Sequence, residues 1–380
     1  MNQVSHDQIA KSKILYIHKT GPGWGGAQQG VLSLINQFHQ EFQKTIFVCN
    51  HGLLFERVKN LPVRSYYLPI GSVWLFPVAL VGLSIILLIE KPDLVHSNHR
   101  YATFLVQIVR KIFPMKYQIL HTARSIFTDK TAFYLGDYNI AITEAVRTNL
   151  IQQFRIPADK VEVIYNGIEL IPSDGDHPFI RCSSEHFNPN GKICISSVGS
   201  LVPVKGHSYL IQAVARLPKQ TQERIMVLIA GDGPLRNKLE QQAKQLGLNH
   251  VIKFLGYRTD IDRVLKQCQF NVVTSNQEGH CRVIIEAFRL GKPSIAFELD
   301  YVRESIHPNR SGLLVPLYDV DALARAIQFY VNHPEIAHQH GEFGRQWAND
   351  KFTMKAMFDR YRAVYLKLLN TNSKFKRKNR

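Results

Sequence analysis

Short apolar runs rich in β-branched residues alternate with segments of helical periodicity along the whole 380-residue chain. This alternation is typical of parallel sheets covered by helices on both faces. In the first half we expect strands at 13–18, 45–49, 94–97, 118–122, 138–142 and 161–165. In the second half we expect strands at 193–198, 225–230, 251–254, 270–275, 293–297 and 313–315. The sequence therefore predicts an α/β fold made of two units.

The boundary between the units is predicted from a change in composition. Residues 171–191 are rich in Pro, Gly, Ser and Asn and lack periodicity, which favours a linker. The first domain is then 1–170 and the second 192–352, followed by a C-terminal helix over 353–372 and a basic tail over 373–380. The last seven residues, KFKRKNR, hold five basic side chains, and we expect them to form a mobile tail attracted to phosphates or acidic lipid head groups.

Composition excludes several classes of protein. Hydrophobic residues make up 45% of the chain and charged residues 20%, which excludes disordered, collagen-like and disulfide-scaffold proteins. The five cysteines are scattered without a C-x-x-C pair, as expected for reduced thiols rather than a zinc site. The chain begins with a polar segment that lacks an apolar export core, so we expect a cytoplasmic protein.

The formal net charge of +17 favours a polyanionic partner. Nucleic acid, an anionic membrane and a phosphorylated ligand all satisfy this condition. No aromatic-studded basic stripe or recognition motif accompanies the charge, so nucleic acid is the least favoured of the three.

One apolar segment, residues 71–89, carries no charge and is nearly as long as the ~20 residues that span a bilayer. It lies between two expected strands, at 64–70 and 94–97. A single crossing would place those strands on opposite sides of the membrane although they belong to one sheet. We therefore favour a buried or membrane-grazing helix over a transmembrane span.

A glycine-rich loop follows the first expected strand. Gly21, Gly23 and Gly26 satisfy the G-x-G-x-x-G spacing of dinucleotide-binding folds. The next strand ends in Asn50, where such folds need a carboxylate for the ribose, so a nicotinamide cofactor is disfavoured. Two interpretations remain, a helix N-terminus that approaches a phosphate and a simple tight turn.

The second half contains two acids at a suggestive spacing. Glu278 is expected in a loop after a strand and Glu286 in the helix that follows. If helical, eight residues separate the two carboxylates by about 12 Å, too far for the acid and base of a glycosidase. Either they bind two ends of an extended ligand such as a nucleotide sugar, or both are solvated. Lys205 is expected on a neighbouring loop at the same sheet edge, where a cation would meet phosphate.

Three histidines are expected at one sheet edge in the first half, namely His96, His99 and His121. A metal cluster is conceivable there. No carboxylate or cysteine nearby completes a ligand spacing, so we do not expect a metal.

Several ordered motifs together resemble the GT-B glycosyltransferases of the retaining family 4 type, over nearly the whole chain. The motifs are ITEAVRTNL, VIYNGI, VGSLVPVKG, AGDGP, EGHCRVIIE and SGLLVPLYDVDALARAI. The resemblance implies two Rossmann-like domains that face each other across a cleft, with the C-terminal helix crossing back to the first domain. It also implies that the first domain mainly binds the acceptor, that the second binds the sugar nucleotide, and that neither a metal nor another cofactor is required.

The resemblance further implies roles for matching residues. Lys205 would bind the donor diphosphate, Glu278 the sugar and Glu286 the ribose. Gly25 or Gly26 would approach the phosphate. His121 matches a first-domain histidine near the anomeric carbon, and with Lys205 and Glu278 it forms the expected catalytic set.

One position departs from the family pattern. Where family members commonly carry an arginine, this chain has Ser200. We hypothesise that Arg282 or another basic residue replaces this phosphate-binding cation. Gly279 and His280, which precede Arg282, complete the expected donor site.

The expected function is the transfer of a sugar from a nucleotide-sugar donor to a glycan or lipid-linked acceptor, in polysaccharide or lipopolysaccharide biosynthesis. The apolar segment and the basic tail favour a lipid-linked acceptor at the inner face of the cell membrane. Two alternatives are a non-catalytic homologue that binds nucleotide sugars and a sugar-nucleotide epimerase.

Overall fold

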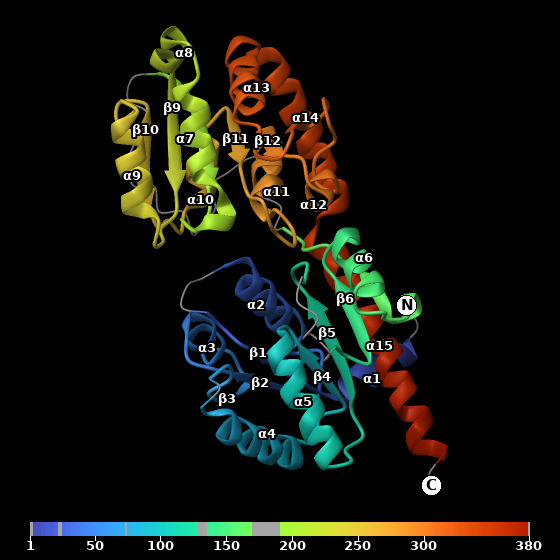
Figure 1. The fold of residues 1–380 in the computed structure, drawn as a ribbon. Coiled ribbons are helices and arrows are strands. Elements are labelled where there is room, and N and C mark those ends of the chain that lie inside the picture. The colour runs from blue at the N-terminus through green and yellow to red at the C-terminus, as the bar shows by residue number, and fades with distance from the viewer. Residues whose placement is uncertain (1–2, 22–24, 73, 128–134, 169–190, 379–380) are drawn as a thin grey trace. The chain divides into compact units, whose positions relative to one another are not determined.

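The computed structural model describes residues 3–21, 25–72, 74–127, 135–168 and 191–378 (Figure 1). The chain forms two compact units. Unit 1 comprises Met1–Asn166 and Lys355–Arg380, and unit 2 comprises Gly167–Met354. The expected linker, 171–191, lies outside the described residues except for Gly191.

Unit 1 contains a seven-stranded parallel sheet in the order β3-β2-β1-β4-β5-β6-β7. Its strands are β1 (Lys13–His18), β2 (Lys44–Cys49), β3 (Arg64–Tyr67), β4 (Leu94–Ser97), β5 (Gln118–Ala123), β6 (Tyr138–Ala141) and β7 (Val161–Val163). All of the strands expected from the sequence are present, with ends shifted by at most two residues for most of them. The largest shift in this sheet is at β3, which ends three residues before the expected position.

Helices cover both faces of the unit 1 sheet. They are α1 (Gln3–Ala10), α2 (Gly26–Phe38), α3 (Leu53–Val58), α4 (Phe76–Glu90), α5 (Arg100–Ile112) and α6 (Glu144–Gln152), with a 3-10 turn η1 (Ala158–Lys160). Along β1 the side chains alternate between faces, as a strand requires. Leu15 and Ile17 share one hydrophobic cluster with α4 and α5. Tyr16, between them, contacts the last helix of the chain instead.

That last helix, α15 (Met354–Lys378), belongs to unit 1. Tyr365 places its hydroxyl 3.1 Å from that of Tyr16, and Arg362 binds both carboxylate oxygens of Glu41 at 2.9 and 2.7 Å. The helix continues to Lys378, six residues past the expected end at 372. Residues 373–378 contain no Gly or Pro and are mostly Lys and Arg, which favour helix, so nothing in the sequence stops it there.

Unit 2 contains a six-stranded parallel sheet in the order β10-β9-β8-β11-β12-β13. Its strands are β8 (Ile193–Val198), β9 (Ile225–Ala230), β10 (Ile252–Gly256), β11 (Phe270–Val273), β12 (Ser294–Phe297) and β13 (Gly312–Val315). Its helices are η2 (Pro203–Lys205), α7 (His207–Ala215), α8 (Lys219–Arg224), α9 (Arg236–Gln245), α10 (Ile261–Lys266), α11 (Arg282–Arg289), α12 (Asp300–Arg303), α13 (Val320–Asn332) and α14 (Pro334–Lys351). The Asp319 side chain accepts a hydrogen bond from the Ala322 N–H at 2.8 Å and so caps α13.

The two strand orders share one feature that positions ligands. In each sheet the chain starts in the middle, winds outward to one edge, and then returns to build the other side. The reversal lies between β1 and β4 in unit 1 and between β8 and β11 in unit 2. Loops at the carboxyl ends of such strand pairs diverge and leave room for a ligand.

The apolar segment 71–89 is mainly helix α4, and no helix among the described residues is long and apolar enough to cross a membrane. One side of α4 packs on the sheet through Ala79, Leu83 and Leu87, whose side chains are fully buried. The segment is thus a helix buried on one side, and its expected contact with a membrane stays a prediction.

Candidate functional site

In unit 2 the loops after β8 and β11 are fastened to each other at the strand reversal. The Thr274 hydroxyl donates to the Lys205 carbonyl at 3.0 Å, and the Asn276 N–H donates to the Val204 carbonyl at 2.9 Å. Gly206 allows this approach: its φ is +64°, and a Cβ there would lie 2.1 Å from the Thr274 carbonyl oxygen. Gly206, directly after Lys205, therefore lets the two loops approach closely and holds the lysine against the β11 loop.

The fastened loops bring Lys205 and Glu278 together in a salt bridge. Their side chains are 26% and 16% exposed, so the pair is shielded from water yet reachable. The Ser275 hydroxyl donates to the same Glu278 oxygen at 2.8 Å. Two of the three predicted catalytic residues are thus in direct contact, although 73 residues separate them in the sequence.

Glu286 is held by a different cation. The Arg282 Nε donates to Glu286 Oε1 at 2.8 Å, one turn apart on α11. Because α11 begins at Arg282, the helical rise used to separate Glu278 from Glu286 applies only to the second half of that interval. The structure therefore shows two separate ion pairs, Lys205 with Glu278 and Arg282 with Glu286. The Arg282 guanidinium, our candidate for the missing family cation, is bound to Glu286.

The remaining predicted donor residues differ in accessibility. Gly279 lies in the loop directly after Glu278. The His280 ring is only 6% exposed and lies 5.5 Å from the Phe352 ring. Burial, with the charges of Arg282 and Lys351, lowers the pKa of His280 to about 4, so this ring is neutral at physiological pH.

In unit 1 the predicted histidine, His121, lies in β5 and is 1% exposed. Its Nδ1 is 2.8 Å from the Thr103 hydroxyl oxygen. That hydroxyl donates to Ser97 Oγ at 2.7 Å, and Ser97 donates to the His99 carbonyl at 3.1 Å. With the Thr103 proton directed to Ser97, Nδ1–H of His121 is the donor to Thr103, and Nε2 carries the free lone pair.

The His121 ring is neutral over the physiological range. Burial, with the charges of His99, Arg100 and Arg124, lowers its pKa to about 3. Its Nε2 atom is buried and accepts no hydrogen bond from the described residues. A buried polar atom without a partner calls for an explanation, and a hydrogen bond from a ligand hydroxyl is one.

The three histidines expected at this edge do not form a metal site. His96 uses both nitrogens, Nδ1 at 2.9 Å from the Tyr365 hydroxyl and Nε2 at 2.8 Å from the Thr122 hydroxyl. Within the described ranges, no three His, Cys, Asp or Glu residues are grouped as metal ligands would be. Hydroxyl groups hold the His96 and His121 rings, and the Tyr101 N–H donates to His99 Nδ1 at 3.2 Å.

Sequence reasoning missed two residues of this edge. Thr103 fixes His121, and Arg124 donates to Asn98 at 3.0 Å and to Asn166 at 3.1 Å. Arg124 directly follows β5, which was a usable signal, since residues just after parallel strands meet at one edge. Thr103 lies inside α5 and carried no such signal.

The glycine loop of unit 1 is described in part. Gly25 is the N-cap of α2, and its N–H donates to Gln28 Oε1 at 3.0 Å. Gly26 is the first residue of that helix. Residues 22–24 lie outside the described residues, so the interpretation as a phosphate-approaching turn stays a prediction.

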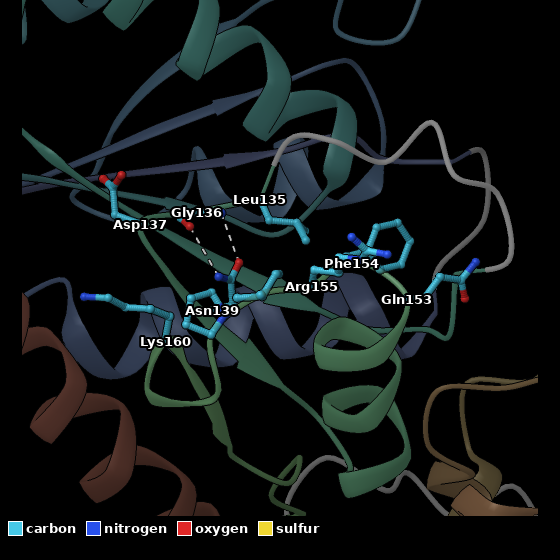
Figure 2. A pocket seen from close by; sticks show the side chains of 10 residues that line it. Leu135, Gly136, Asp137, Asn139, Gln153, Phe154, Arg155 and Lys160 are labelled. Atoms are coloured by element: carbon cyan, nitrogen blue, oxygen red, sulfur yellow. Dashed lines mark hydrogen bonds between the residues drawn. The ribbon is translucent and has the colours of Figure 1, made fainter.

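A surface pocket lies elsewhere in unit 1 (Figure 2). Its lining comes from the start of β6, the end of α6 and the η1 turn, and includes Asp137, Asn139, Arg155 and Lys160. Asn139 bonds with the Gly136 backbone there at 3.0 and 3.3 Å. The pocket is at the amino ends of β6 and β7 and contains none of the predicted site residues.

Comparison with known proteins accounts for both units. Residues 24–170 match the family model described as Glycosyltransferase Family 4, and residues 181–347 match Glycosyl transferases group 1. The chain therefore belongs to the GT-B glycosyltransferases, as its motifs predicted.

Individual relatives are distant. The lipopolysaccharide core biosynthesis glycosyltransferase LpsE of Rhizobium meliloti is 29% identical over 167 residues, 44% of this chain and 48% of LpsE. The O-antigen chain mannosyltransferase C of Escherichia coli is 30% identical over 181 residues, 46% of this chain and 47% of the relative. The matched regions span between about half and two thirds of the curated relatives they align with.

Among solved structures, Anabaena HepE in complex with UDP-glucose superposes with a TM-score of 0.79 at 21% identity, covering 94% of this chain and 99% of HepE. This likeness shows the fold, which is the two-domain GT-B fold predicted from the sequence.

Proposed function

We propose that this protein is a retaining glycosyltransferase that transfers a sugar from a nucleotide-sugar donor, bound by unit 2, to a glycan or lipid-linked acceptor. The observation that carries the proposal is the Lys205–Glu278 pair on two loops fastened at the strand reversal of unit 2. Family membership supports the reaction class, and the UDP-glucose complex of a protein with this fold supports the donor class.

Donor binding follows from charge. The diphosphate of a nucleotide sugar carries two negative charges and competes with Glu278 for the Lys205 ammonium. Once released, the Glu278 carboxylate accepts hydrogen bonds from sugar hydroxyls. Arg282 and Glu286 separate in the same way, Arg282 toward phosphate and Glu286 toward the two ribose hydroxyls. Each carboxylate thus exchanges one partner for another, so neither is left buried and unpaired.

Catalysis requires stabilisation of the departing diphosphate. Breaking the bond between sugar and phosphate builds positive charge at the anomeric carbon and negative charge on the leaving group. Once the donor is bound, Lys205 is held by its loop and opposes the negative charge without further rearrangement, which is the efficient arrangement for a transition state. We assign the acceptor proton to the leaving phosphate oxygen, with retention of configuration and without a metal ion.

His121 has a different task in this proposal. As a neutral ring with a bare Nε2, it accepts a hydrogen bond from a sugar hydroxyl and orients the transferred sugar. It is not the sole base. This assignment rests on the resemblance to the family together with the fixed tautomer.

The acceptor is proposed to be a lipid-linked glycan precursor at the inner face of the cell membrane. Support comes from the relatives named for lipopolysaccharide core and O-antigen synthesis. The net charge of +17 suits a protein that works beside anionic lipid.

The decisive experiment screens sugar nucleotides for thermal stabilisation and then measures turnover with the best donor. A donor at 100 times its Kd should stabilise the fold by ~2.7 kcal/mol. Product analysis with and without a chelator then tests the chemistry: transfer with retained configuration and unchanged rate is expected. Donor rearrangement without acceptor would indicate an epimerase, and stabilisation without any turnover would indicate a binding homologue.

A further inference from the structure

Helix α4 presents an apolar face that the rest of the described chain leaves uncovered. Its buried side packs on the sheet, and its other side exposes Val78, Val81 and Ile85 at 56%, 59% and 51%. Leu88 and Ile89 continue the exposed side at 42% and 64%. We call these five residues, together with Trp74 and Leu75 just before the helix, the α4 face.

The α4 face is unusual for a protein surface in water. Trp74 is 92% exposed, although a tryptophan side chain is among the most costly to leave in water. Of the 17 large hydrophobic side chains that are exposed among the described residues, seven belong to this face. Segment 71–89 contains no charged residue that would interrupt it. An apolar patch of this continuity marks an interaction surface.

Charge around the α4 face selects the kind of partner. Residues 53–118, which carry it, contain eight Lys and Arg but only three Asp and Glu. One of those acids, Glu90, is buried and neutralised by Lys44 at 2.5 Å and Arg64 at 3.0 Å, so it presents no negative charge to a partner. Lys91, at the end of α4, is exposed. The segment that carries the face is therefore net basic.

The end of the neighbouring helix α5 also exposes apolar and basic side chains. Helices α4 and α5 pack side by side, with Phe76 of α4 6.0 Å from Phe104 of α5 (Figure 1). At the end of α5, Ile112 and Phe113 are exposed at 54% and 37%, between the exposed Lys111 and Lys116. This alternation of apolar and basic side chains matches the boundary between lipid tails and anionic head groups.

We propose that the α4 face is a membrane-docking surface that lies in the plane of an anionic bilayer, with Trp74 at the level of the head groups. The helix lies on the membrane and does not span it, because its other side is part of the unit 1 core. The proposal gives the proposed lipid-linked acceptor a physical route to the enzyme. Docking itself does not depend on turnover, so docking and transfer can fail separately.

The test is sedimentation of the full chain with lipid vesicles. We expect the wild-type protein to pellet with mixed phosphatidylcholine and phosphatidylglycerol vesicles and much less with phosphatidylcholine alone. The double substitution Val81→Glu and Ile85→Glu should lower the vesicle-bound fraction at least about tenfold. Val81→Ser with Ile85→Ser should also lower it, which separates lost apolar contact from charge repulsion. Far-UV circular dichroism confirms that each variant is folded.

A matched control uses exposed apolar residues of unit 2. Leu246→Glu with Phe329→Glu adds the same charge at positions 41% and 36% exposed, and it should leave vesicle binding unchanged. Tryptophan emission gives a second readout: binding should shift it to shorter wavelength, and Trp74→Phe should abolish most of that shift.

Three results would overturn the docking surface. The first is a wild-type protein that does not bind anionic vesicles. The second is equal binding by the wild-type protein and the α4 variants, which would assign any binding to another basic segment such as 373–380. The third is a wild-type dimer in analytical ultracentrifugation that the α4 substitutions convert to a monomer, which would make a second copy of the chain the occupant of the face.

Discussion

The strand reversals of the two units have the same topology but different electrostatic character. In unit 2 the reversal carries ions, Lys205 with Glu278 and, on the helix that follows, Arg282 with Glu286. In unit 1 it carries neutral rings and hydroxyl groups, with His121 held by Thr103, and its cation Arg124 is bound to the neutral amides of Asn98 and Asn166. The fold therefore sets where ligands bind, while the loop and helix residues decide what chemistry occurs there.

The difference teaches what each unit can bind. A ligand of unit 2 must offer an anionic group to Lys205 and hydroxyl groups to Glu278, because otherwise it cannot replace the salt bridge between them. A ligand of unit 1 meets a neutral, buried acceptor in His121 Nε2 and needs only a hydroxyl donor. A nucleotide sugar supplies the first through its diphosphate and sugar hydroxyls, and a hydroxyl of the transferred sugar supplies the second. The following predictions test this division.

The largest effect is expected from Lys205→Ala. Loss of the fixed cation that opposes charge on the leaving diphosphate should lower kcat by about 10²- to 10³-fold. Affinity for the acceptor should change little, because the acceptor is assigned to unit 1. Steady-state kinetics with the donor and acceptor varied separately measure both quantities.

The control for this substitution is Lys244→Ala, an exposed lysine on α9 of the same unit. It removes the same charge away from the strand reversal and should leave kcat unchanged. An unaltered kcat/KM in Lys205→Ala would remove the ionic role from unit 2 and with it the contrast between the units.

A smaller effect, on donor binding, is expected from Glu286→Gln. If Glu286 accepts both ribose hydroxyls, the neutral amide weakens two hydrogen bonds to a charged group and should raise the donor KM about tenfold or more. The value of kcat should stay within about threefold, since the ribose does not react.

The chain contains a matched pair for this test. Arg236 and Glu240 on α9 repeat the geometry of Arg282 and Glu286, with Nε to Oε1 distances of 2.9 and 2.8 Å. Glu240→Gln should leave the donor KM unchanged. Equal small effects in both variants would mean that Glu286 serves only its helical ion pair.

The sequence predicted the ionic edge better than the neutral one, for a physical reason. Lys205 and Glu278 lie in the connections that follow β8 and β11, and such connections converge at one edge whatever the strand order. The strands themselves were predictable because buried parallel strands are continuous apolar runs. The strand order and its reversals were not, since they depend on which strands pair and not on local periodicity.

The neutral edge depends on long-range packing that local patterns do not encode. The His96–Tyr365 hydrogen bond joins residues 269 positions apart, and Thr103 reaches His121 from the middle of a helix. The short helices α8, α10 and α12 could not be expected from the sequence, because four to six residues show too little periodicity. In α4 apolar residues occur on all sides, so periodicity could not distinguish the buried side from the exposed one.

A third prediction concerns the neutral edge directly. Thr103→Val keeps the size of the side chain but removes the oxygen that holds His121 Nδ1–H. The freed ring can turn or change tautomer. A misplaced His121 Nε2 should then lower kcat about tenfold, with little change in the donor KM. Thr103→Ser restores the oxygen and should recover most of the activity. Failure of the serine variant to recover it would show that Thr103 acts through packing alone.

The smallest effect is the expected insensitivity of unit 1 to acid. A histidine with an ordinary pKa of ~6.5 would be only about 3% neutral at pH 5, and a reaction that needs the neutral ring would slow at least tenfold between pH 7 and pH 5. Because burial lowers the pKa of His121 to about 3, the ring loses its neutral form only as the pH falls through that value. We therefore expect kcat to change less than about twofold over this interval, with circular dichroism confirming that the protein stays folded.

In Thr103→Val, a more mobile and better hydrated ring should titrate at higher pH, so that an acid limb moves into the measured range. An acid limb near pH 6.5 in the wild-type enzyme that disappears in His121→Asn would show that His121 carries a proton during the reaction, and the neutral character assigned to unit 1 would be wrong.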